Sequence, residues 1–248
     1  MKVLIFKTKE EACNWTADKL ISAIKDFQPS AEKPFLVLGL PTGSTPIDVY
    51  KRLVAAYKAG QISFKNVVTF NMDEYVGLSA EHDQSYHYFM NENLFNHIDI
   101  PQNQIHILDG LAKNPTEECH LYEEKIASFG GIDIQLGGIG ENGHLAFNEP
   151  GTSFDSVTHV QQLTQNTIEV NSRFFEKKED VPQKALTIGL KTIFNAKEVI
   201  VLALGRKKAE AMYQSTRMAV SENCPASLMQ NHTKSIFVID EEAGSKLS

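Results

Sequence analysis

Compact apolar runs alternate with amphipathic stretches along the chain. The runs are short, end in turn residues and are typical of strands buried on both faces of a sheet; they cover 1–6, 35–40, 67–70, 132–136, 199–204 and 235–239. After the first run, apolar residues recur with helical spacing (i, i+3, i+4, i+7) at Ala17, Leu20, Ile21 and Ile24. Helical patterns also cover 46–59, 85–97, a segment that opens at 114, and 206–218.

Strands separated by helices predict βαβ units, and hence an α/β fold with a mainly parallel sheet covered by helices on both faces. A chain of 248 residues suits a single domain of this kind, covering 1–248. The segment from about 157 to 181 interrupts the pattern, because it is rich in Gln, Asn and charged residues. We interpret this segment as a surface flap or lid, and the alternative is an ordinary pair of connecting helices.

Composition narrows the choice of partners. The formal net charge is −7, and no basic cluster is present, so the chain is a poor candidate for binding nucleic acid or an anionic membrane. The apolar run at the N-terminus is too short for a signal sequence or a membrane span. The three cysteines, Cys13, Cys119 and Cys224, are scattered and have no metal-ligand spacing. A cytoplasmic location is therefore the default expectation.

Three polar motifs directly follow predicted strands, and in parallel sheets the ligand lies beyond the carboxyl ends of the strands. The first motif is Leu40-Pro41-Thr42-Gly43-Ser44-Thr45-Pro46. We expect Thr45 to cap a helix that begins at Pro46, with Asp48 as the acid of a capping box. Free backbone N–H groups and hydroxyls at this helix start would suit a phosphate. A plain turn with a good cap is the alternative.

The second motif, Phe70-Asn71-Met72-Asp73-Glu74-Tyr75, places two adjacent acids after a buried strand. One acid at the end of a strand can lie at the mouth of a site, with a pKa set by burial, while its neighbour points elsewhere. A strand-end turn with solvated carboxylates is the alternative.

The third motif runs from Gly137 to Pro150 and places one His, two Asn and two Glu in a glycine-rich loop. His144 suits proton transfer near neutral pH, and a carboxylate or amide beside its second ring nitrogen would fix its tautomer. Glycines at 138, 140 and 143 match a dinucleotide-binding fingerprint, but the Asn-Glu-Pro-Gly that follows would break the helix that this fingerprint must open. Neither metal-ligand spacing nor a serine nucleophile elbow is present in the sequence.

Taken in order, these motifs resemble those of the glucosamine-6-phosphate deaminase family. The resemblance continues through Asn171-Ser172-Arg173-Phe174-Phe175, Leu204 to Ala209 and Pro225 to Leu228, and so covers essentially the whole chain. It implies a Rossmann-like three-layer αβα sandwich and a reaction that needs neither cofactor nor metal. That reaction is the isomerisation and deamination of glucosamine 6-phosphate to fructose 6-phosphate and ammonia. A sugar phosphate is the implied partner, and a homo-oligomer is left open.

The resemblance also implies roles for individual residues. Asp73 would move a proton between C2 and C1 of the substrate. His144 would help to open the pyranose ring, with Asn142 and Glu149 as orienting and relay partners. The contacts to the substrate phosphate would come from Gly43, Ser44, Thr45, Arg173 and Lys208, with Lys207 as the alternative to Lys208.

Two departures from the family pattern matter. The position of Asn142 is Asp in some members, and an amide carries no charge to stabilise an imidazolium, so Glu149 would have to do more of that work. Allosterically activated members bind N-acetylglucosamine 6-phosphate through a basic pair soon after the Asn-Glu-Pro motif. The corresponding stretch here, residues 158–161, contains neither Arg nor Lys.

Three rival functions stay open at this point. A galactosamine-6-phosphate deaminase or another sugar-phosphate isomerase would differ only in the shape of its pocket. A sugar-phosphate sensor without catalytic activity should have lost Asp73, His144 or Glu149, and all three are present. A lactonase of the same superfamily would not need Asp73 as a base for enolisation.

Overall fold

The structure is a computed structural model and describes residues 1–164, 168–169, 175 and 181–247. Its main sheet has seven strands, all parallel, in the order β1-β10-β9-β6-β2-β3-β5. The strands are β1 (Lys2–Phe6), β2 (Leu36–Leu40), β3 (Val67–Asn71), β5 (Ile105–His106), β6 (Ile134–Gly138), β9 (Glu198–Ala203) and β10 (Ser235–Asp240). Six of them coincide with the predicted apolar runs. The two-residue strand β5 is too short to give a pattern.

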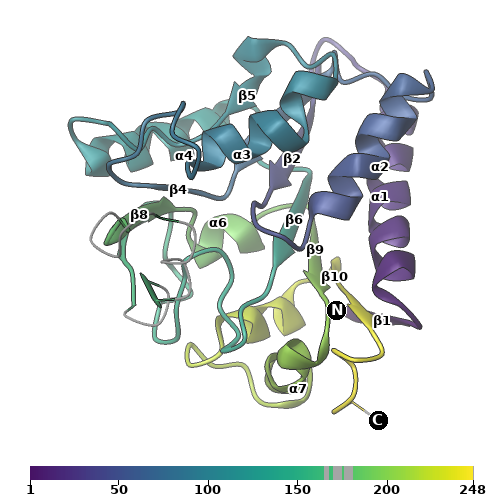
Figure 1. Cartoon of the computed structure of the whole chain (residues 1–248), viewed down its shortest axis with the longest axis vertical. Coiled ribbons are helices and arrows are strands. Elements are labelled where there is room, and N and C mark those ends of the chain that lie inside the picture. The colour runs from purple at the N-terminus through teal and green to yellow at the C-terminus, as the bar shows by residue number, and fades with distance from the viewer. Residues whose placement is uncertain (165–167, 170–174, 176–180, 248) are drawn as a thin grey trace.

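Helices cover both faces of this sheet (Figure 1). Side chains from α1 (Lys9–Asp26), α2 (Ile47–Lys58) and α3 (Tyr86–Asn93) share one buried cluster with alternate residues of the strands. Side chains from α4 (Pro115–Ser128), α6 (Leu190–Phe194) and α7 (Ala209–Arg217) share a second cluster with the intervening strand residues. Since successive side chains of a strand point to opposite faces, the two clusters are the two sides of a three-layer αβα sandwich. The predicted fold class is confirmed.

Short 3₁₀ segments connect several of these elements. They are η1 (Phe95–His97), η2 (Gln102–Gln104), η4 (Arg206–Lys208) and η5 (Pro225–Asn231). The predicted helix 85–97 is therefore α3 followed by η1, and the predicted helix 206–218 is η4 followed by α7.

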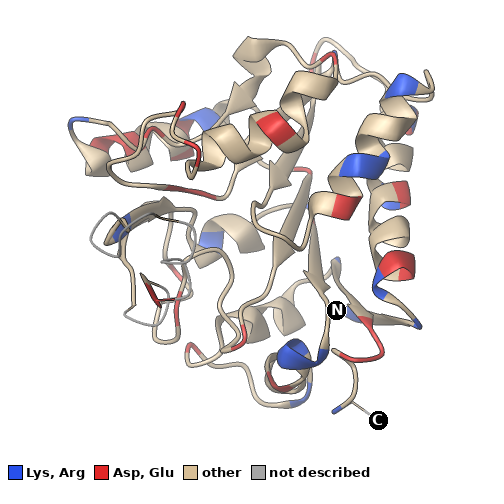
Figure 2. Cartoon of the chain, viewed as in Figure 1, with Lys and Arg blue, Asp and Glu red and all other residues tan. Residues whose placement is uncertain are grey.

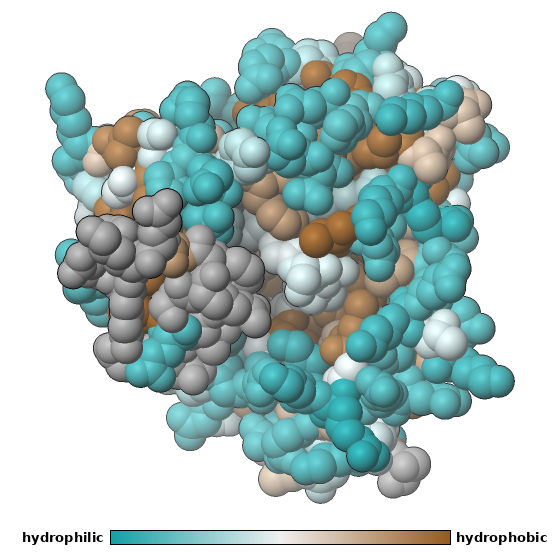
Figure 3. Space-filling view, in the orientation of Figure 1, coloured by the Kyte–Doolittle hydropathy of each residue, from teal (hydrophilic) through white to brown (hydrophobic). Residues whose placement is uncertain are grey.

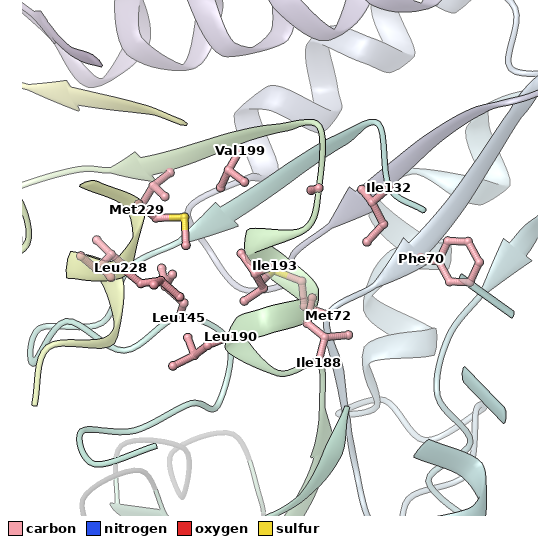
Figure 4. Packing of buried hydrophobic residues seen from close by; sticks show 14 of the residues in the cluster. Phe70, Met72, Ile132, Leu145, Ile188, Leu190, Ile193, Val199, Leu228 and Met229 are labelled. Carbon is pink, nitrogen blue, oxygen red and sulfur yellow. The ribbon is translucent and has the colours of Figure 1, made fainter. Parts of the chain in front are cut away.

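Figure 4 shows the packing of the second cluster, in which Leu190 and Ile193 of α6 lie beside Ile188 and Met72. Each of these side chains is at most 2% exposed. Full burial of an aliphatic side chain is worth about 1.5–3 kcal/mol, so α6 anchors the region beneath the ends of the strands despite its five residues.

The start of α2 differs from the prediction. The helix begins at Ile47, one residue later than expected, and Pro46 precedes it with helical dihedral angles and no side-chain cap. The carboxylate of Asp48 accepts a hydrogen bond from Lys51 Nζ at 2.8 Å instead of turning back towards Thr45. The capping box predicted here is therefore wrong. Asn114 does cap α4, since its side chain accepts a hydrogen bond from the N–H of Glu117 at 3.3 Å.

A second, smaller sheet was not predicted. It contains β4 (Asp73–Tyr75), β8 (Lys184–Thr187) and β7 (His159–Gln162) as antiparallel neighbours in that order. The first part of the predicted flap is thus strand β7, not a connecting helix. The segments 165–167, 170–174 and 176–180 lie outside the described residues, so the role of 157–181 as a flap stays a prediction.

The charged residues of both signs are mixed over the surface, as expected for a chain without a basic cluster. Figure 2 shows acidic and basic residues interspersed over the helices and loops. Among the described residues, no helix is both long and apolar enough to cross a membrane.

All three cysteines are buried and unbridged. Burial, with smaller contributions from nearby carboxylates, raises the pKa of Cys13 and Cys119 to about 11. These two thiols are inert at neutral pH.

Candidate active site

The three polar motifs lie together at the carboxyl ends of the strands of the main sheet. They follow the carboxyl ends of β2, β3 and β6, which are adjacent strands, and β9 lies next to β6. From β2 the chain continues to β3 on one side, whereas β6 lies on the other side, so β2 and β6 flank a topological switch point. The loop from β2 to α2 lies near the middle of Figure 1, and Figure 3 shows a hollow in the middle of this face.

Asp73 begins β4, two residues after the end of β3. Its side chain is 7% exposed, and its Oδ1 atom is buried without a hydrogen-bond partner among the described residues. Burial raises the pKa of Asp73 to about 8, and the neighbouring charge of Glu74 adds to this effect. A carboxyl group tuned in this way can gain or lose a proton near neutral pH.

The neighbouring carboxylate, Glu74, points elsewhere, as predicted. It is 1% exposed and lies at the start of α3. Its oxygens accept hydrogen bonds from the backbone N–H groups of Tyr75, Tyr86 and His87, at 2.8, 3.0 and 3.0 Å. A carboxylate at the N-terminus of a helix satisfies unpaired donors and is favoured by the helix dipole, so Glu74 holds β4 against α3.

His144 is held in a chain of hydrogen bonds within the glycine-rich loop. Its Nδ1 atom lies 2.7 Å from Asn142 Oδ1, and Asn142 Nδ2 donates to Glu149 Oε2 at 2.8 Å. The distance from His144 Nδ1 to Glu149 Oε2 is 3.6 Å. Because the amide Oδ1 can only accept, Nδ1 carries the proton, and Nε2 is the ring nitrogen left for proton exchange. The structure therefore brings together the predicted trio His144, Asn142 and Glu149.

A glycine makes room for this histidine. A Cβ atom at Gly140 would lie only 2.2 Å from the His144 ring. The loop is closed by a hydrogen bond from the N–H of Gly140 to the carbonyl of His144, 2.9 Å long. The absence of a side chain at position 140 thus allows the ring to lie against the backbone.

Strand β8 joins the Asp73 strand to the histidine loop, and this strand was not predicted. Asp73 pairs with Thr187 across the two strands. The Thr187 hydroxyl accepts a hydrogen bond from the N–H of Phe147 at 3.1 Å, and Asn148 Nδ2 donates to the carbonyl of Ile188 at 2.8 Å. The only available signal was the short apolar run around Leu186, which has no adjacent polar motif.

The loop after β2 offers unpaired donors. Gly43 has a φ of +88°, which favours glycine. Within the described part of the chain, neither the backbone N–H groups nor the hydroxyls of Gly43, Ser44 and Thr45 donate a hydrogen bond. The Tyr50 hydroxyl fixes the loop from below by donating to the carbonyl of Pro41 at 2.5 Å. Such a set of free donors at the start of a helix is suited to an anion.

The two lysines that are candidates for the phosphate contact differ in their surroundings. Lys207 is exposed, and its Nζ lies 3.9 Å from the Glu141 carboxylate. Lys208 is half-buried; burial lowers its pKa, Glu141 opposes that effect and Lys207 adds to it. Both follow β9, which is separated from β2 by β6 alone, or roughly 10 Å of backbone spacing. Arg173 lies outside the described residues. Among the residues that are described, no group of His, Cys, Asp and Glu has the geometry of a metal site.

Known proteins resemble the chain along nearly its whole length. The family model for glucosamine-6-phosphate isomerases and 6-phosphogluconolactonases matches residues 7–238. A glucosamine-6-phosphate deaminase from Treponema denticola is 54% identical over 248 residues, which is 100% of this chain and 92% of that protein. One from Drosophila melanogaster is 46% identical over 100% of this chain and 90% of its own length.

Solved structures with the same fold include members of this family. A monomeric glucosamine-6-phosphate deaminase superposes with a TM-score of 0.93 at 42% identity, covering 99% of this chain and 100% of that one. A 6-phosphogluconolactonase from Trypanosoma cruzi has a TM-score of 0.78 at 18% identity, with coverage of 100% and 97%, and shares the fold.

Proposed function

The chain belongs to the family of glucosamine-6-phosphate isomerases and 6-phosphogluconolactonases, and within it we propose that the chain is a glucosamine-6-phosphate deaminase. The product would be fructose 6-phosphate with release of ammonia, in amino-sugar catabolism. One observation carries this proposal. A buried carboxyl, Asp73, and the hydrogen-bonded trio of His144, Asn142 and Glu149 both lie at the carboxyl ends of the parallel strands. A cytoplasmic location belongs to the same proposal.

Ring opening is the first step. The pyranose form must lose the C1 hydroxyl proton and regain a proton at the ring oxygen, which gives the open-chain aldehyde. His144 Nε2 is free for this exchange, because Nδ1 is engaged by Asn142. Glu149 lies close enough to stabilise the imidazolium that forms when the ring takes up a proton.

Proton transfer from C2 to C1 is the second step. The aldehyde acidifies the C2 proton, and the Asp73 carboxylate removes it to leave an enolamine. Return of the proton at C1 gives an imine at C2, and water then releases ammonia and forms the ketone of fructose 6-phosphate. Electrons do not pass between molecules in this sequence, so it requires no redox cofactor. A carboxylate with a raised pKa is a stronger base for C2 than an ordinary one.

Phosphate binding would hold the sugar in place for both steps. The unpaired donors of Gly43, Ser44 and Thr45 and the half-buried Lys208 are the proposed contacts, together with Arg173. These contacts lie away from C1 and C2, so their binding energy can orient the reacting carbons.

The proposal is tested by measuring products directly. Purified protein is incubated with glucosamine 6-phosphate, with EDTA present and no cofactor added, and ammonia and fructose 6-phosphate are quantified. Equimolar release supports the proposal. Release from galactosamine 6-phosphate alone would assign the other epimer. Hydrolysis of 6-phosphogluconolactone without deamination would assign the lactonase reaction, and no turnover of any of them would indicate a sensor.

Replacing Asn142 with aspartate is expected to keep the activity and move the pH profile of kcat/KM to higher pH. The aspartate still accepts the proton of His144 Nδ1, but it cannot donate to Glu149 as the amide does at 2.8 Å. Two carboxylates at that distance favour uptake of a proton by the group. Rates measured between pH 6 and 10 check this. Loss of turnover in a variant whose melting temperature equals that of the native chain would contradict the orienting role of Asn142.

The kinetics are expected to be hyperbolic in glucosamine 6-phosphate and insensitive to N-acetylglucosamine 6-phosphate. The stretch Thr158-His159-Val160-Gln161 provides no cation for the effector's phosphate, and His159 Nδ1 is engaged by the carbonyl of Val157 at 2.8 Å. Initial rates with and without the effector, at substrate concentrations below KM, test this expectation. A sigmoidal curve that the effector makes hyperbolic would contradict it.

A further inference from the structure

One motif of the family resemblance, Pro225 to Leu228, has no part in the proposed reaction. Most of it lies in a turn between α7 and β10, residues 221–227, which we call the supporting turn. The N–H of Cys224 donates to the carbonyl of Ser221 at 2.9 Å, and the N–H of Ser227 donates to the carbonyl of Cys224 at 2.8 Å. The buried Ser227 hydroxyl accepts from the N–H of Ser221 at 2.9 Å and donates to its carbonyl at 3.1 Å. These hydrogen bonds close the turn on itself and make it rigid.

The supporting turn holds the histidine loop at two points. The N–H of Ala226 donates to the carbonyl of Gly143 at 2.9 Å, and the N–H of Gly151 donates to the carbonyl of Glu222 at 2.9 Å. Gly143 lies between the first two members of the trio in the sequence, and Gly151 follows the third member by two residues. The backbone that carries the trio is therefore tied to the same rigid turn near both of its ends.

The thiol of Cys224 packs against the loop at the first of these points. A Cβ atom added at Gly143 would lie 2.6 Å from Cys224 Sγ, so the sulfur occupies the space in which a side chain would stand. The sulfur lies 3.3 Å from the Ser215 hydroxyl, and the whole Cys224 residue is only 6% exposed. Since its position is fixed in this way, the sulfur prevents Gly143 from moving towards the turn.

Other elements hold the part of the loop that follows His144. Leu145 belongs to the same buried cluster as Leu228 and Met229, as Figure 4 shows. Phe147 is tied to β8 through its hydrogen bond to the Thr187 hydroxyl. The stretch before His144 has the supporting turn as its neighbour, and Cys224 is the side chain of that turn in contact with Gly143.

We propose that Cys224 is a positioning residue for His144, and that its sulfur acts through Gly143, on which it packs. This inference rests on the proposed role of His144 in ring opening. Asn142 Oδ1 accepts hydrogen bonds from both the backbone N–H of His144, at 3.2 Å, and the ring Nδ1, at 2.7 Å. Because Gly143 joins these two residues, a shift of its backbone would change both contacts at once. The sulfur thus keeps Nε2 directed at the substrate oxygens.

The test compares the removal of one sulfur atom at two buried positions. Cys224→Ala is expected to lower kcat about tenfold, because a 1 Å displacement of a catalytic group can cost about a hundredfold and this gap permits a smaller one. KM should stay close to the native value, since the proposed phosphate contacts are made by other loops. Cys224→Ser keeps an atom in place of the sulfur, together with its partner Ser215, and should restore most of kcat.

Cys119→Ala is the matched control. Cys119 is 2% exposed and lies in α4, so its removal should lower the melting temperature as the loss of any buried atom does, but should leave kcat unchanged. An equal loss of kcat in Cys119→Ala would show that a cavity anywhere in the core slows the reaction. That result, or a Cys224→Ser variant as slow as Cys224→Ala, would overturn the inference.

A second readout does not depend on turnover. In protein labelled with ¹⁵N at histidine, the His144 ring signals are identified by their absence from His144→Gln. At about pH 9, where an imidazole is neutral, the native signals should report a proton on Nδ1, and those of Cys224→Ala should move towards a mixture of the two tautomers. This measurement tests the position of His144 even if the native chain releases no ammonia from glucosamine 6-phosphate. Unchanged His144 signals in Cys224→Ala would overturn the inference.

Discussion

Asp73→Asn is expected to lower kcat for deamination by roughly three orders of magnitude, because a positioned general base typically contributes 10²–10⁴-fold. An amide has the size of the carboxyl group but cannot accept the C2 proton. Substrate binding should change little, since the proposed phosphate contacts are made by other loops. The measurement is the release of ammonia and fructose 6-phosphate at saturating substrate. Asp83→Asn, an exposed acid just before α3, is the matched control and should be fully active.

The same variant is expected to be more stable than the native chain at high pH. The folded-state pKa of Asp73 is raised to about 8, whereas an unfolded aspartate titrates near 4. The stability that the protonated side chain contributes is complete below about pH 4 and is lost as pH rises through about 8. Asparagine has no proton to lose, so the variant should gain about 1–3 kcal/mol in the free energy of unfolding at pH 9 and nothing at pH 4.

The rate and the stability of Asp73→Asn together distinguish a role of Asp73 as the base from a structural role. If Asp73 is the base, activity falls while stability at pH 9 rises, and native kcat/KM increases as pH rises through about 8. A fully active Asp73→Asn variant would remove Asp73 from the mechanism and favour a lactonase-like reaction. Inactivity with lower stability at pH 9 would point to a structural role.

Gly140→Ala is expected to lower kcat about a hundredfold, since a displacement of roughly 1 Å in a catalytic group can cost that much. The new methyl group would lie 2.2 Å from the His144 ring, so the ring must move. Its 2.7 Å contact with Asn142 would be lost with that movement. Fold integrity is checked by thermal unfolding, and kcat by product release.

Gly137→Ala is the control for this prediction. Gly137 lies three residues earlier, in β6, and a Cβ atom there would lie 3.6 Å from Met72 Cε, an ordinary contact distance. This variant should keep most of its activity. Equal losses in both variants would mean that any methyl group in this segment is harmful and that the position of the His144 ring is not the cause.

Buried parallel strands were predictable because they appear in a sequence as unbroken apolar runs. The runs at 35–40 and 199–204 correspond to β2 and β9, and the motifs that follow them locate the edge of the sheet where the site lies. The hydrogen-bonded trio was also predictable, because its members are within eight residues of one another.

The small antiparallel sheet was not predictable from the same signals. Strand β4 consists of Asp73, Glu74 and Tyr75, whose acids look like a solvated turn, and β8 is four residues long. Pairing between residues more than a hundred positions apart leaves no local periodicity, so the link from Asp73 through Thr187 to the histidine loop appears only in three dimensions. The contact between Glu74 and His87 was missed because it depends on where α3 begins.

The position of β1 at the edge of the sheet constrains how the protein is made. Its partner in the main sheet is β10, with Lys2 paired to Ile236 and Phe6 to Asp240. Strand β1 therefore leaves the ribosome before its partner β10 has been synthesised, by roughly 10–50 seconds at ordinary rates of translation. During that interval its backbone donors and acceptors are open to other chains. Nascent chains halted before residue 235 should consequently need chaperones more than the finished protein does.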